Sequence, residues 1–241
     1  MGESINVLLY SGGIDSLCAK TILERKGLEL IPLRFSFRTP YNGHESRVVQ
    51  EYNKLELGAP VVELELSVLS NSGFGDVHIP ARNALLVLGT IAYVYNSFGF
   101  EPKRLINIYF PQILEFGRDK NEIFWLTLQG LLRHSYGYNV KILRPFSRWT
   151  KWRLIRESGL SREFILRYSW SCYYPVGDEP CYRCSGCLMR EYSFMKLGWD
   201  YRYVPYEGQY KFGGNPLIYL LDLEKVLYWG LLLLRWRLGR W

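Results

Sequence analysis

The first two thirds of the chain alternate between short apolar runs and segments whose apolar residues recur every three or four positions. The apolar or alternating runs predict β-strands at 5–10, 28–37, 61–69, 104–110 and 139–146. Helical spacing predicts α-helices at 16–26, 44–57, 81–98, 121–136 and 150–159. Strands that alternate with helices in this way predict an α/β fold, a five-stranded parallel sheet with helices on both faces.

The pattern changes after Phe146. A short helix closed by Gly159 is followed by a cysteine-containing stretch that reads as loop, and an aromatic tail begins at Trp199. The tail becomes helical in pattern from about Pro216, and no Pro/Gly/Ser-rich linker separates it from the rest. We therefore predict an α/β domain over residues 1–148 and a smaller helical part over 149–241, which contains the cysteines and packs on it.

A glycine turn interrupts the pattern between the first strand and the first helix. Residues 11–16 read Ser-Gly-Gly-Ile-Asp-Ser, which is neither of the two common glycine-rich phosphate motifs, GxxxxGK[ST] and GxGxxG. Glycines let the backbone approach a ligand, and the following helix presents free N–H groups and a positive dipole end. We predict a pyrophosphate site; a tight turn without a ligand is the alternative. The binding residues would be Ser11, Gly12, Gly13, Ile14, Asp15 and Ser16. Asp15 beside phosphate implies Mg²⁺ between them.

Four of the five cysteines lie within 16 residues. Cys172, Cys181, Cys184 and Cys187 have the spacing C-x8-C-x2-C-x2-C. Four thiolates complete the tetrahedral shell of a structural Zn²⁺ ion, which leaves no open position for catalysis. Two disulfides and an iron–sulfur cluster are the alternatives. The fifth cysteine, Cys18, is predicted to be a small buried residue inside the first helix.

Composition narrows the class of protein. The chain has 241 residues, 48% of them hydrophobic, and a formal net charge of +7. Its Lys and Arg residues are scattered rather than clustered in runs, so we expect phosphate-bearing ligands and no direct binding to nucleic acid. The start of the chain does not read as a signal peptide, and no apolar run reaches 18 residues. We expect a cytoplasmic protein without a membrane span.

Several motifs together resemble one enzyme family. The Ser11–Ser16 string, Pro80-Ala81-Arg82-Asn83, the pair Thr150-Lys151, and Trp170-Ser171-Cys172 before the other cysteines are similar to 7-cyano-7-deazaguanine synthase, a family of the PP-loop ATP pyrophosphatase superfamily. The resemblance covers roughly residues 5–200. It implies a ligase, often dimeric, that converts 7-carboxy-7-deazaguanine, ammonia and ATP to the nitrile through an adenylated intermediate.

The resemblance also implies roles for single residues. Arg82 and Lys151 would neutralise charge on the phosphates, although each is equally compatible with a surface cation. Backbone from Leu33 to Phe35 would hold adenine, and Asp119 fits by position a loop that meets the base. Asn83 suits either the site or a helix cap.

Two stretches depart from the family pattern. Residues 41–45 read Tyr-Asn-Gly-His-Glu where relatives have Tyr-Gly-Gln-Arg-His, and His44 suits either the site or a surface helix cap. Residues 109–120 largely lack the family's Asp-Tyr…Tyr-Pro-Asp-Cys-Arg string, so the acid substrate stays open. A PP-loop ligase or tRNA-modifying enzyme acting on another acid or base, and a non-catalytic nucleotide-binding subunit, remain as alternatives. The aromatic tail at 205–241 and a dimer interface at 217–236 also stay open.

Overall fold

A computed structural model describes residues 4–69, 79, 81–99, 101, 103–113 and 122–200. Pro80, Asp119, most of the 109–120 departure and the predicted tail helix lie outside them. The chain divides into two compact units, 1–203 and 204–241, and the described residues belong to the first.

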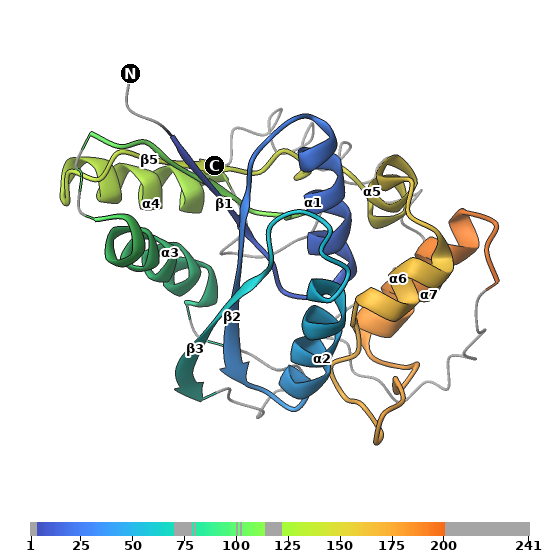
Figure 1. Cartoon of the computed structure of the whole chain (residues 1–241). Helices are drawn as coiled ribbons and strands as arrows, with labels where there is room; N and C mark the ends of the chain where they lie inside the picture. The colour runs from blue at the N-terminus through green and yellow to red at the C-terminus, as the bar shows by residue number, and fades with distance from the viewer. Residues whose placement is uncertain are drawn as a thin grey trace, which may run out of the picture. The chain divides into compact units, whose positions relative to one another are not determined.

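A five-stranded sheet forms the centre of this unit (Figure 1). Its strands are β1 (Ile5–Leu9), β2 (Ile31–Arg38), β3 (Val62–Leu69), β4 (Ile106–Tyr109) and β5 (Val140–Leu143). The order is β3-β2-β1-β4-β5 and every neighbouring pair is parallel, which confirms the predicted sheet. Strand order reverses between β1 and β4, and ligands of open parallel sheets bind at the carboxyl ends of the strands at such a point.

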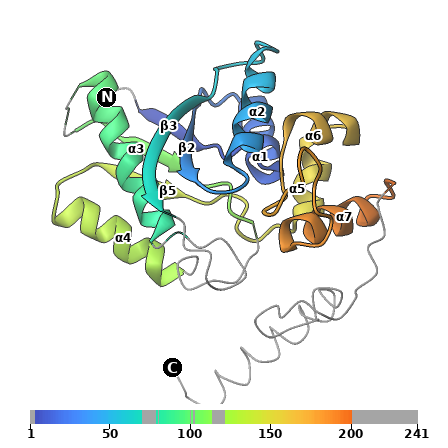
Figure 2. The ribbon, with the colours of Figure 1, turned by 90° about the horizontal axis from the view of Figure 1, so that it is seen from below.

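Helices cover both faces of the sheet, as the alternating pattern predicts. Helices α1 (Ile14–Arg25), α2 (Asn42–Asn53) and α5 (Lys151–Ser158) lie on one face, and α3 (Arg82–Phe98) and α4 (Glu122–His134) on the other (Figures 1 and 2). Val7 and Leu8 are both fully buried in β1 but belong to two separate cores. Successive strand side chains point to opposite faces, so one strand supplies both cores.

Two short helices follow where the sequence reads as loop. Helix α6 (Arg162–Tyr168) begins at Ser161, whose hydroxyl accepts a hydrogen bond from the Phe164 N–H. Helix α7 (Ser185–Lys196) begins directly after Cys184. The helical character expected for the C-terminal part is confirmed. Neither helix was predicted individually, and the loop expectation for the cysteine stretch was wrong from Ser185 onward. Seven residues are too few to show helical periodicity, and the Ser-Gly pair at the start of α7 is typical of a turn.

Within the described part of the chain, helices α5, α6 and α7 share a core with the sheet domain. Helix α5 packs on α1 and on α7, and α6 packs on α2. Phe164 of α6 meets the edge of Tyr52 of α2 at 6.5 Å between ring centroids. The domain boundary at residue 148 stays a prediction.

Among the described helices, none combines the length and the apolar character needed to cross a membrane.

Candidate functional site

The glycine turn between β1 and α1 is closed by its own hydroxyl groups. Ser16 Oγ donates to the Gly13 carbonyl oxygen at 2.9 Å and accepts from the Ser11 N–H at 3.2 Å. Gly12 has φ +79°, and a Cβ there would lie 3.1 Å from Val49 and 3.2 Å from a backbone oxygen of α2. The turn is therefore tight, and glycine at position 12 is required by both backbone angle and space.

The turn delivers the N-terminus of α1 to the switch point of the sheet. Gly13 is the N-cap of α1 and offers no side-chain acceptor to the first N–H groups of the helix. These donors and the positive end of the helix dipole are therefore available to an anion. The arrangement suits the pyrophosphate predicted for residues Ser11 to Ser16.

Asp15 and Lys151 meet although 136 residues separate them. Lys151 Nζ lies 2.5 Å from Asp15 Oδ1, and both side chains are partly buried. Lys151 is the first residue of α5, whose N-cap Thr150 accepts from the Arg153 N–H at 3.4 Å. The packing of α5 on α1 thus places Lys151 beside the glycine turn.

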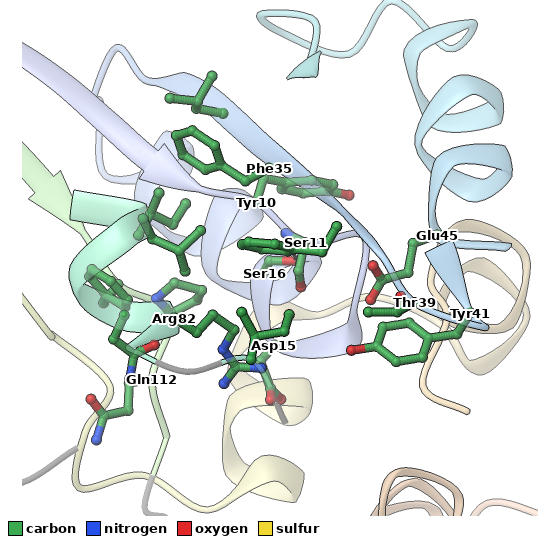
Figure 3. A pocket seen from close by; sticks show the side chains of 18 of the residues that line it. Tyr10, Ser11, Asp15, Ser16, Phe35, Thr39, Tyr41, Glu45, Arg82 and Gln112 are labelled. Atoms are coloured by element: carbon green, nitrogen blue, oxygen red, sulfur yellow. Dashed lines mark hydrogen bonds between the residues drawn. The ribbon is translucent and has the colours of Figure 1, made fainter. Parts of the chain in front are cut away.

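A cavity of about 260 Å³ opens beside the loop at the carboxyl ends of the strands (Figure 3). Six residues predicted from the sequence line it: Ser11, Asp15, Ser16, Leu33, Phe35 and Arg82. Gly12, Gly13 and Ile14 shape the loop without lining the cavity, and Lys151 reaches its edge through Asp15. Loop, strand β2 and helix α3 therefore converge on one site.

Arg82 enters the cavity from the first position of α3. In Figure 3 its guanidinium group extends into the cavity toward Asp15. Ala81 precedes it as the N-cap in the left-handed region, at φ 51°. Within the described part of the chain Arg82 forms no ion pair, and a cation at a helix N-terminus is unfavourable without an anion. Asn83 is buried and lines the cavity. Because Ala81 is the cap, the cap interpretation of Asn83 was wrong.

Beneath the cavity lies a buried charge network that sequence reasoning missed. Arg34 of β2 is fully buried and donates to Glu63 at 2.6 Å, to Asn42 Oδ1 at 2.7 Å and to Glu45 at 3.2 Å. Burial raises the pKa of Glu45 to about 7, although Arg34 and Arg82 oppose this shift. Glu45 lines the cavity. An arginine between apolar neighbours in a predicted strand was the available signal, because such a charge needs buried partners.

Aromatic side chains form another wall of the cavity. Tyr41, Tyr173 and Phe35 line it, and the rings of Tyr41 and Tyr173 lie 5.4 Å apart. Burial raises the pKa of Tyr41 to about 12, so its phenol stays neutral at physiological pH. Flat apolar surface beside charged groups suits a heterocycle that carries polar substituents.

The four cysteines come together as predicted. Their Sγ atoms all lie within 4.8 Å of one another, and those of Cys172 and Cys184 are 4.0 Å apart. Four thiolates around a tetrahedral Zn²⁺ would be roughly 3.8 Å apart. The backbone N–H groups of Cys181 and Tyr173 donate to the Sγ atoms of Cys172 and Cys184. All four are free thiols, so the disulfide alternative was wrong, and the cluster is compatible with a zinc site.

Trp170, two residues before the first cysteine of the cluster, links the cysteine segment to the glycine turn. The Trp170 N–H donates to the Gly12 carbonyl oxygen at 2.8 Å, and the indole Nε1 donates to the Cys172 carbonyl oxygen at 2.8 Å. The indole also stacks on His44 of α2 at 4.3 Å. His44 lies within α2 after its cap Tyr41, and it does not line the cavity. Its cap interpretation was therefore wrong.

Cys18 is fully buried as predicted.

Comparisons with known proteins identify the family of the chain. The family model described as "Queuosine biosynthesis protein QueC" matches residues 60–198. Curated relatives named 7-cyano-7-deazaguanine synthase come from Chlorobaculum tepidum (25% identical, covering 80% of this chain and 93% of the relative), Synechococcus sp. (23%, 82% and 96%) and Campylobacter jejuni (26%, 79% and 93%). A solved NMN synthetase from Francisella tularensis aligns over 83% of this chain and 79% of its own, at 13% identity and a TM-score of 0.38, too remote for any conclusion. The family model spans more than half of the chain, and the chain belongs to the QueC family.

Proposed function

We propose that this chain is a ligase that converts 7-carboxy-7-deazaguanine and ammonia to 7-cyano-7-deazaguanine at the expense of ATP. The observation that carries the proposal is the complete loop from Ser11 to Ser16 at the edge of a cavity that also holds Arg82. The names of the relatives supply the substrate class.

In the first step, a carboxylate oxygen of the acid attacks the α-phosphorus of ATP. The P–O bond to the β-phosphate breaks, and pyrophosphate leaves into the loop. The hydroxyl of Ser11 and the N–H groups at the start of α1 suit the charge that develops on this leaving group, while Ser16 holds the turn in shape. Arg82 and Lys151 supply positive charge from two other elements.

Ammonia then attacks the acyl carbon, AMP leaves, and the amide forms. A second ATP activates the amide oxygen in the same way; loss of a proton and of AMP gives the nitrile. Two AMP and two pyrophosphate are therefore expected for each nitrile. Asp15 and the phosphate oxygens form the hard oxygen set that Mg²⁺ prefers, and the bound ion would balance the charge of the triphosphate.

The four cysteines would hold a structural Zn²⁺ ion that supplies folding energy and no open coordination site. Metal analysis of the purified native chain should find one zinc per chain. Iron in its place, or a metal-free chain that stays folded and active, would contradict this part of the proposal. A homodimer and a cytoplasmic location belong to the proposal as well.

Mass spectrometry of a reaction with 7-carboxy-7-deazaguanine, ammonium and Mg-ATP tests the proposal. We expect the nitrile together with AMP and pyrophosphate. Arg82→Met should lower the rate about 100-fold, the usual effect of removing one charge-stabilising group. Arg133→Met, an exposed cation on α4, should keep the wild-type rate. If the chain consumes ATP only with another acid, that acid is the substrate and 7-carboxy-7-deazaguanine is not. If it consumes no ATP with any acceptor, the chain is a non-catalytic nucleotide-binding subunit.

A further inference from the structure

Glu45 presents a carboxyl group to the cavity that the phosphate chemistry does not use. The residue lies in the first turn of α2 and its side chain is 19% exposed. Its Oε2 accepts from Arg34 at 3.2 Å, and no described residue donates to its Oε1. In Figure 3 the carboxyl group of Glu45 points into the cavity. One oxygen is therefore fully available to a ligand.

The buried network holds this carboxyl in place without satisfying it. Arg34 is fully buried and its shorter contacts go to Glu63, at 2.6 Å, and Asn42, at 2.7 Å. One guanidinium group thus serves two carboxyl groups. Glu45 is positioned by a rigid partner but keeps hydrogen-bonding capacity, as a recognition residue requires.

The surroundings of Glu45 select the kind of ligand group that it can bind. A negative group is disfavoured by the carboxyl itself, and a cation is disfavoured by Arg34 and by Arg82 across the cavity. What remains is a neutral group with N–H or O–H donors. The adjacent rings of Tyr41 and Tyr173 offer a surface against which a flat heterocycle packs.

We infer that Glu45 is the specificity-determining residue that accepts hydrogen bonds from the donor edge of a guanine-type base in this cavity. The inference rests on the proposed function. On that edge the ring N–H and the exocyclic amino group are neighbouring donors that point the same way, and a carboxylate offers two acceptors. Arg82 on the other side would then face the acidic substituent of the same heterocycle.

The test combines a protein change with a matched ligand change. The ligands are 7-carboxy-7-deazaguanine and the analogue that lacks the 2-amino group, each measured as kcat/KM at saturating Mg-ATP and ammonium. The variants are Glu45→Gln and Glu63→Gln. Both lose a carboxylate on Arg34, but Glu63 does not line the cavity.

The wild type should prefer the amino-bearing acid by roughly 5- to 150-fold, the usual range for a two-point hydrogen-bonded recognition. Glu45→Gln should lose most of that preference with the KM for ATP unchanged, while Glu63→Gln should keep it. A wild type that uses both acids equally, or a Glu45→Gln variant that keeps the preference, overturns the inference while leaving the proposed function intact. A Glu45→Gln variant in which only the KM for ATP or for ammonium rises also overturns the inference. A wild type that turns over neither acid refutes the proposed function, and the inference with it.

Discussion

Replacing Glu45 with glutamine should change how the stability of the fold depends on pH. Burial raises the pKa of this carboxyl from its usual 4.5 to about 7 in the folded chain. Between these values the folded chain binds a proton that the unfolded chain has released. The free energy of unfolding of the wild type therefore falls as pH rises through this window.

The structure sets the size of the effect. The interval from 4.5 to about 7 corresponds to at most about 3 kcal/mol, and the part above pH 5.5 to about 2 kcal/mol. The groups that face Glu45 are Arg34, Arg82, Glu63 and Tyr41. Both guanidinium groups stay protonated in this range, and the phenol of Tyr41 stays neutral because its pKa is about 12. The glutamine side chain of the variant cannot ionise, so the corresponding loss of stability is absent from it.

Urea unfolding of the metal-loaded chain at pH 5.5 and pH 8, followed by tryptophan fluorescence, measures the effect. The wild type should lose about 2 kcal/mol more than Glu45→Gln between these two conditions. Comparing the two chains cancels contributions that they share, including those of the cysteine cluster. Glu29→Gln, which changes a carboxyl outside this network, should follow the wild type. Equal pH dependence in wild type and Glu45→Gln would refute the reasoning.

Three further substitutions test the loop and its supports. Gly12→Ala places a Cβ on a residue with φ +79° and should raise the KM for ATP at least about tenfold, measured by steady-state kinetics; an unchanged KM would mean that the loop tolerates the shift. Lys151→Met should lower kcat about 100-fold in the nitrile assay, whereas Lys141→Met, at an exposed position of β5, should not. Gly186→Ala places a Cβ over the Ser171 carbonyl oxygen and should reduce zinc content per chain, by metal analysis; full zinc occupancy would contradict the close packing.

The fold was largely predictable because each sheet element carries its own local signal. Buried strands such as β1 read as apolar runs, and helices such as α3 are long enough for their period to show. Strand order is a different matter, because it depends on which strands pair across the whole chain. Helix α6 was not predicted because its seven residues hold fewer than two turns, although Ser161 is a recognisable N-cap residue.

Some residues of the site could likewise be predicted from local sequence, and others could not. The loop at Ser11–Ser16 and the four cysteines are contiguous patterns, so their chemistry could be predicted from the order of the residues alone. Arg34 signalled only that a buried charge needs partners. Its partners Glu45 and Glu63 could not be predicted, because they arise from contacts between α2, β2 and β3 that no spacing encodes. Asp119 stays a prediction, since it lies outside the described residues.

The hydrogen bond from Trp170 to Gly12 limits how this protein can be re-engineered. The indole of Trp170 stacks on His44 of α2 and donates to the Cys172 carbonyl oxygen, while the Trp170 backbone N–H donates to Gly12, so three stretches of chain meet at one residue. A chimera that exchanges the cysteine segment with that of a relative must therefore carry over the matching α2 residue and glycine turn. If the cysteine segment is exchanged alone, its tryptophan will not match the α2 residue and the glycine turn of the recipient chain.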